Sequence, residues 1–145
     1  MISIAKLKQL CESMVGSATG LVAAVPVSVE ANMADKVNAV SEDETPVLFY
    51  LPPSAQGRGH VDRFEEENMV VLFVMVRYRP RTSTSFDALA ASQPAAEAVK
   101  NRLVELAASP CAEIRPDLSS INILPETEFF GNWAGWSIGF TVTTR

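Results

Sequence analysis

Eight consecutive apolar residues, Met69 to Val76, constrain the fold of this 145-residue chain more than any other feature. As a strand, this run presents apolar side chains on both faces, because successive side chains of a strand point to opposite sides. A strand that is apolar on both faces is typical of the centre of a sheet that is covered on both sides. The alternative is that one of its faces is an interface between subunits.

Three further segments have the composition of strands. Residues 46–51 are β-prone and end at two prolines, and residues 119–124 carry Ile121 and Ile123. Residues 134–144 alternate between large apolar and small polar side chains. This alternation predicts a half-buried strand with one polar or wet face.

The rest of the chain contains two helical patterns and one ambiguous segment. Residues 3–14 repeat apolar side chains at helical spacing. A long helix is expected over residues 92–108, with Ser92 as its N-cap, because Pro94 is tolerated in a first turn and not in a helix interior. The segment before residue 40 alternates like a strand at first and then has a helical face, which favours a helix from about Glu30 to Val40.

Together these elements predict an α+β fold, with a four-stranded, mainly antiparallel sheet packed by one long helix and an N-terminal helix. The length matches a common domain size, so we expect residues 1–145 to form a single domain with its own core. The mean hydropathy of +0.13 is slightly apolar. The surplus apolar surface must be buried within one chain or between several.

The charge balance argues against nucleic acid as a partner. Seventeen acidic and twelve basic residues give a net charge of −5, whereas nucleic-acid binding depends on Lys and Arg that neutralise phosphates. The densest basic group, Arg77, Arg79 and Arg81, is expected either at a solvated strand end or as a salt-bridge partner of residues 65–67.

The apolar runs also argue against a membrane as a partner. The run at residues 18–29 is interrupted by Gly20 and Pro26 and is too short to span a bilayer. The first ten residues lack the uninterrupted apolar stretch of a signal peptide. We therefore expect a soluble, cytoplasmic protein.

No arrangement typical of catalysis or metal binding is found in the sequence. His60 is the only histidine, and the pair His60 and Asp62 lies in residues 54–62, a polar segment expected to be an exposed loop. Cys11 and Cys111 lack the spacing of a zinc site and are expected to be buried small hydrophobes. We expect no enzyme, with no catalytic residue, no metal ligand and no cofactor.

Aromatic side chains gather near the end of the chain. Phe129, Phe130 and Trp133 surround a turn at Gly131 and Asn132. Aromatic side chains on a turn either cap the core or anchor a protein interface. These three are the candidate interface residues of the chain, and the segment 54–62 is a second candidate surface.

Three stretches carry a resemblance to a known family: Lys36-Val-Asn-Ala-Val leading into Thr45-Pro-Val-Leu-Phe-Tyr-Leu-Pro, the strand 70–78 followed by the helix 95–106, and the ending Phe130-Gly-Asn-Trp-Ala-Gly-Trp-Ser-Ile-Gly-Phe-Thr-Val. This pattern resembles small phage and prophage tail-assembly proteins of the tail-terminator or tail-completion type. The resemblance covers residues 36–144, whereas the Gly- and Ala-rich residues 16–24 have no counterpart in it. It implies a structural protein that associates with itself into a ring on the finished tail tube, with a tail-tube or head-connector protein as partner.

Two other functions remain open from the residues alone. A small ligand-binding or regulatory α+β domain would need an apolar pocket with a few polar groups, and Met69, Phe73 and Trp136 are the residues expected to line it. An enzyme would have to act through His60 and Asp62.

Overall fold

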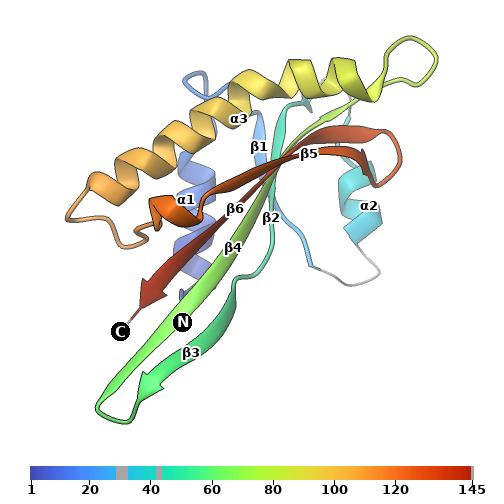
Figure 1. Cartoon of the computed structure of the whole chain (residues 1–145). Coiled ribbons are helices and arrows are strands. Elements are labelled where there is room, and N and C mark those ends of the chain that lie inside the picture. The colour runs from blue at the N-terminus through green and yellow to red at the C-terminus, as the bar shows by residue number, and fades with distance from the viewer. Residues whose placement is uncertain (29–32, 42–43, 145) are drawn as a thin grey trace.

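In the computed structural model, which describes residues 1–28, 33–41 and 44–144, one mixed sheet forms the centre of the molecule (Figure 1). Its six strands are β1 Ala23–Pro26, β2 Val47–Tyr50, β3 Ser54–His60, β4 Arg63–Arg77, β5 Asn122–Phe129 and β6 Trp133–Thr144. The strand order is β1-β2-β4-β6-β5, and β3 pairs with β4 outside this path. β1 and β2 are parallel and all other pairs are antiparallel.

The α+β fold is confirmed, whereas the prediction of four strands is wrong in detail. β1 was not among the four expected strands, and it is only four residues long. β3 replaces the loop expected at residues 54–62. All of its side chains are exposed, so the segment has no apolar alternation by which a strand is recognised.

The central strand β4 is longer than its apolar run and has a different neighbour at each end. On one side, β3 pairs with residues 63–69 and β2 pairs with residues 72–75. On the other side, β6 pairs with residues 66–77. The outer part of the β3–β4 hairpin therefore lacks a third strand and projects from the body of the molecule (Figure 1). We call residues 57–65 the arm.

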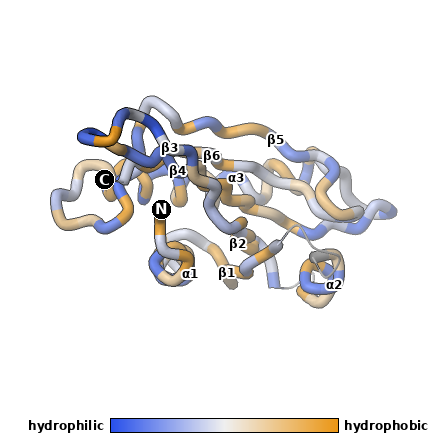
Figure 2. The backbone as a smooth tube through the Cα atoms, turned by 90° about the horizontal axis from the view of Figure 1, so that it is seen from below, coloured by the Kyte–Doolittle hydropathy of each residue, from blue (hydrophilic) through white to orange (hydrophobic). Residues whose placement is uncertain are grey.

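The three helices are α1 Ile4–Ser13, α2 Met33–Asn38 and α3 Ser85–Ala108. α1 lies where it was expected. The helix expected over 30–40 is found only as α2, and its first expected residues, 30–32, lie outside the described residues. In Figure 2, α1 and α2 lie on either side of β1 and β2. Helices therefore contact both faces of the sheet.

α3 begins seven residues before the expected start, and Pro94 lies in its interior. Its N-cap is Thr84, whose Oγ1 accepts the N–H of Asp87 at 3.2 Å while the Asp87 carboxylate accepts the N–H of Thr84 at 2.8 Å. Ser92 is not the N-cap: it is fully buried, and its Oγ donates to the carbonyl of Ala88 at 2.8 Å.

Side chains supply hydrogen-bond donors to the turn that precedes Pro94. Pro94 has no N–H for the helical hydrogen bond and its ring displaces the preceding turn. In that turn, the carbonyl of Leu89 accepts the indole N–H of Trp136 at 3.0 Å and the hydroxyl of Ser92 at 3.1 Å. The contact from Trp136, which lies 47 residues away in the sequence, could not be read from local propensity.

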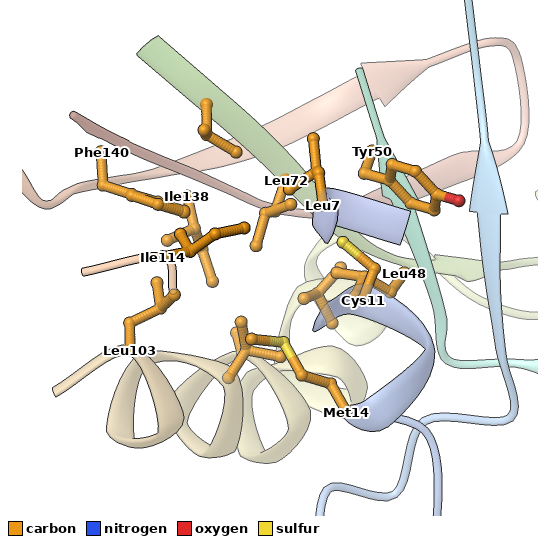
Figure 3. Close-up of a cluster of buried hydrophobic side chains, with 14 of the residues drawn as sticks. Leu7, Cys11, Met14, Leu48, Tyr50, Leu72, Leu103, Ile114, Ile138 and Phe140 are labelled. Carbon is orange, nitrogen blue, oxygen red and sulfur yellow. The ribbon is translucent and has the colours of Figure 1, made fainter. Parts of the chain in front are cut away.

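The core divides between the two faces of the sheet. The first face, which includes the even-numbered residues of β4, is covered by α1 and α3 (Figure 3). Its fully buried side chains include Leu7, Leu48, Leu72, Leu103 and Ile138. The second face has a smaller cluster beside α2: Val27, Val37, Val47, Phe49, Met75, Phe129 and Trp133.

Candidate functional site

The second face of the sheet is covered at one end only. On β4, Met75 is fully buried in the cluster beside α2, Phe73 and Val71 are half-buried, and Met69 is 54% exposed. The neighbouring even-numbered residues Val70, Leu72 and Val74 have no exposed surface. Both sides of the apolar run were expected to be covered. The cover is complete on the first face from Val70 to Val74 and incomplete on the second face.

A groove of about 380 Å³ lies on the uncovered part of the second face. Met69 and Val71 of β4 form one wall, and Leu124 of β5, 50% exposed, forms the other. Gly139 lies in the floor, between its pairing partners Val71 on β4 and Asn122 on β5. The floor is low because the glycine has no side chain. The remaining lining residues are Ser120, Asn122, Ser137, Phe140 and Thr141.

The floor of the groove is the polar face predicted for the last strand. Ser137, Gly139 and Thr141 face this side, whereas Ile138 and Phe140 point into the core of the first face. The hydroxyl of Ser137 donates to the carboxylate of Glu126 at 2.7 Å. The groove therefore joins apolar walls to a polar floor with one acidic group beside it.

The aromatic turn is mostly core. Trp133 is fully buried and meets Phe49 edge-on, with ring centroids 5.3 Å apart. Phe129 is 8% exposed, and its ring centroid lies 4.9 Å from that of Phe73. Only Phe130 is substantially exposed, at 42%, on a turn residue with a φ of 47°. Of the three candidate interface residues, Phe129 and Trp133 are thus placed in the core, and Phe130 alone is open to a partner.

The pairing of the strands explains this correction. Trp133 pairs with Arg77 of β4 and so faces the second side of the sheet, next to β2. A register shift between Glu126 and Phe129 turns Phe129 to the same side. The sequence predicts an aromatic turn without indicating which of its rings the sheet covers.

The pocket expected for a ligand-binding domain does not form as predicted. Met69 and Phe73 belong to the second face, whereas Trp136 packs against the cluster on the first face. One pocket cannot be lined by all three, because the sheet lies between them. The groove contains Met69 but neither of the other two.

His60 and Asp62 lie at the end of the arm. Both are exposed, and neither side chain has a hydrogen-bond or ion-pair partner among the residues that the structure describes. Arg58 of the arm forms an ion pair with Glu67 at 2.5 Å. The arm therefore presents charged groups to solvent and no assembled acid–base pair.

Arg77, at the other end of β4, has a structural role. The guanidinium of Arg77 donates to the carbonyl of Val40 at 2.9 Å, just beyond α2. This contact satisfies a backbone acceptor beyond the end of that short helix. Arg77 is the last residue of β4, as expected, but it is half-buried and not freely solvated.

The two cysteines differ in environment. Cys11 lies on the buried side of α1, and burial, with a smaller contribution from the charge of Glu12, raises its pKa to about 12. Cys111 is exposed, which corrects the prediction that both are buried.

In the described part of the chain, no group of three or more His, Cys, Asp or Glu side chains is placed to hold a metal ion. Within the same residues, every helix is too short or too polar to cross a membrane. Comparison of the chain with known protein families and with curated proteins found no match.

Proposed function

We propose that this chain is a phage or prophage virion-assembly protein of the tail-terminator or tail-completion type, which acts by self-association and by docking on protein partners. The resemblance of residues 36–144 supports the class. The observation that supports the mode of action is the apolar part of the second face, which no element of the described chain covers. Contiguous exposed apolar surface is typical of protein–protein contact sites.

A ring imposes two requirements on each subunit. Every copy needs two different surfaces that fit one another, because a head-to-tail contact joins unlike patches. A stable interface also buries roughly 1,200–2,000 Å² in total. The groove is one such surface, and Phe130 and the arm extend the area available on the same molecule.

In this proposal, surface that is not used between subunits binds the second partner. A tail-tube or head-connector protein docks on a face of the ring, so the chain acts in the host cytoplasm during assembly and afterwards in the virion. The net charge of −5 supports contact with protein in preference to nucleic acid. Neither a cofactor nor a chemical step belongs to this function.

Deletion of the coding sequence from the phage or prophage genome that carries it tests the function. Electron microscopy of the particles after induction is expected to show heads and tails that fail to join or tails with abnormal ends, and a plasmid copy is expected to restore whole particles. Normal particles in the deletion strain would contradict the proposal. Neighbouring genes for head, portal and tail-tube proteins would support it, and metabolic neighbours would oppose it.

A second candidate function, binding of a small ligand, is favoured by one observation. The groove volume of about 380 Å³ lies within the range of roughly 300–1,000 Å³ that is common for ligand pockets. Its apolar walls and few polar groups also fit such a site. Native mass spectrometry of the protein purified from its own host would show a bound small molecule if this candidate is correct, and Leu124→Arg would abolish that binding.

A further inference from the structure

The end of the arm exposes apolar side chains that nothing in the described chain covers. Val61 is fully exposed in the turn, and Phe64 is 58% exposed. The ring of Phe64 lies over Gly57, where an added Cβ would be only 2.9 Å from the ring. Packing on the glycine holds the phenyl ring on the arm and leaves its outer side open.

The arm cannot reach the groove of its own molecule. Phe64 and Met69 belong to the same strand, and five residues of strand separate them by roughly 16 Å. They also lie on opposite faces of the sheet, since their positions differ by an odd number of residues. β4 leads the arm straight away from the body (Figure 1). If the arm end fills such a groove, the groove belongs to another copy of the chain.

One charge of the arm, that of Arg63, is complementary to the acidic side of the groove. Residues 116–144, which form β5, β6 and one wall of the groove, contain Asp117, Glu126 and Glu128 but no Lys or Arg. The arm, residues 57–65, contains Arg58 and Arg63 against Asp62 and Glu65, and Arg58 is already paired with Glu67. Arg63 has no ion-pair partner among the described residues, and its guanidinium is exposed.

We propose that the arm of one copy docks in the groove of the next, with Val61 and Phe64 against Met69 and Leu124 and with Arg63 beside Glu126. This inference deepens the self-association in the proposed function and rests on it. The two surfaces are unlike and lie on different parts of the chain, so the contact is head-to-tail and leads to a closed ring or an open chain. An isolated two-stranded hairpin is marginally stable in water. Docking packs one face of the arm against another copy of the chain.

Sedimentation velocity on the full-length chain tests the contact with two variants. The arm variant combines Val61→Asp with Phe64→Asp, and the groove variant is Leu124→Arg. The unmodified chain is expected to form species larger than a dimer, and each variant alone is expected to be a monomer. An equimolar mixture of the two variants is expected to stop at a dimer, because only one intact arm and one intact groove remain. Phe86→Asp, at a residue 76% exposed on α3, is the control that leaves assembly unchanged.

A charge exchange provides a second measurement that does not alter the apolar contact. Arg63→Glu is expected to weaken association at least tenfold, and adding Glu126→Arg to the same chain is expected to restore it. Circular dichroism verifies that each variant folds, and Phe64→Ser replaces the arm variant if that one does not.

Three results would overturn the inference: arm and groove variants that assemble like the unmodified chain, a mixture that forms no dimer, or an unmodified chain that is monomeric at millimolar concentration. The first result would leave the proposed function intact with a different interface. After the last result, the deletion experiment would still decide the function, because it measures virion assembly and not association in solution.

Discussion

The two faces of β4 are almost equally apolar in sequence and differ sharply in the folded chain. Val70, Leu72 and Val74 are sealed beneath α1 and α3. Met69, on the opposite face, is 54% exposed, although it belongs to the same apolar run. The difference teaches that an apolar pattern predicts which side chains avoid water, while the length and position of the helices decide which of them are covered.

The largest expected effect comes from truncating the covered face. Leu72→Ala removes a fully buried side chain and leaves a cavity, so it should lower the free energy of unfolding by about 2–5 kcal/mol. Met69→Ala, three residues away on the open face, should cost less than about 1 kcal/mol, because part of its side chain is already in water. Urea unfolding of both variants at a concentration where the chain is monomeric measures the contrast. Equal losses would show that the two faces are equally buried in solution.

A pair of glycines on β6 probes the same contrast through the backbone. A Cβ on Gly135 would lie 2.0 Å from the carbonyl oxygen of Val74, so Gly135→Ala must push β6 away from β4. The expected loss is about 1–3 kcal/mol. Gly139, in the groove floor, has no atom within 4 Å of the same position. Gly139→Ala should therefore be neutral or stabilise the strand by up to ~1 kcal/mol. Thermal unfolding of the two variants distinguishes these outcomes, and a reversed order would contradict the strand pairing.

The helix that covers the first face depends on its cap. Thr84→Ala removes the side-chain acceptor of the capping box and should cost about 1 kcal/mol. Hydrogen bonds from Thr84 to the Asp87 carboxylate lower the pKa of Asp87, so its contribution to folding is present above the unfolded-state pKa and is lost as the pH falls through the folded-state pKa. The stability difference between the variant and the parent chain should therefore shrink in acid. A difference that is constant from neutral pH to the acid limit would exclude this role of Asp87.

The smallest effect is a difference in thiol reactivity that leaves the fold unchanged. Cys11 is buried beneath α1 with a pKa of about 12, so it has almost no thiolate at neutral pH, whereas Cys111 is exposed. A disulfide reagent should titrate one thiol in the native protein and two in denaturant. The variant Cys111→Ser should then show no rapid reaction. Rapid modification of Cys11 in the native state would mean that α1 does not seal the first face.

Much of the sheet and its main helix could be predicted because their signals are local. The apolar run became the central strand, the alternation at 134–144 became β6 with its polar face outward, and residues 3–14 became α1. The first two turns of α3 were missed because Pro94 normally marks a helix start. The turn before the proline is held by hydrogen bonds from Ser92 and, across the fold, from Trp136.

The candidate site was less predictable than the fold. The turn of Phe129, Phe130 and Trp133 was recognised as aromatic, but strand register placed two of its three rings in the core. Leu124, which forms the groove wall on β5, lies at the end of the strand expected at residues 119–124, but its local sequence does not indicate that its face of the sheet stays open. β3 was missed because an exposed hairpin buries too little to show an apolar period.

The sequence by itself determined the class of fold, the central strand and the wet face of the last strand, because these depend on side chains two to four positions apart. Only the tertiary structure decided which face of the sheet stays open, that the polar segment before β4 becomes an arm, and that Trp133 is core. Those outcomes depend on pairings between strands that lie tens of residues apart, such as Leu72 with Ile138. Local periodicity carries no information about such pairings.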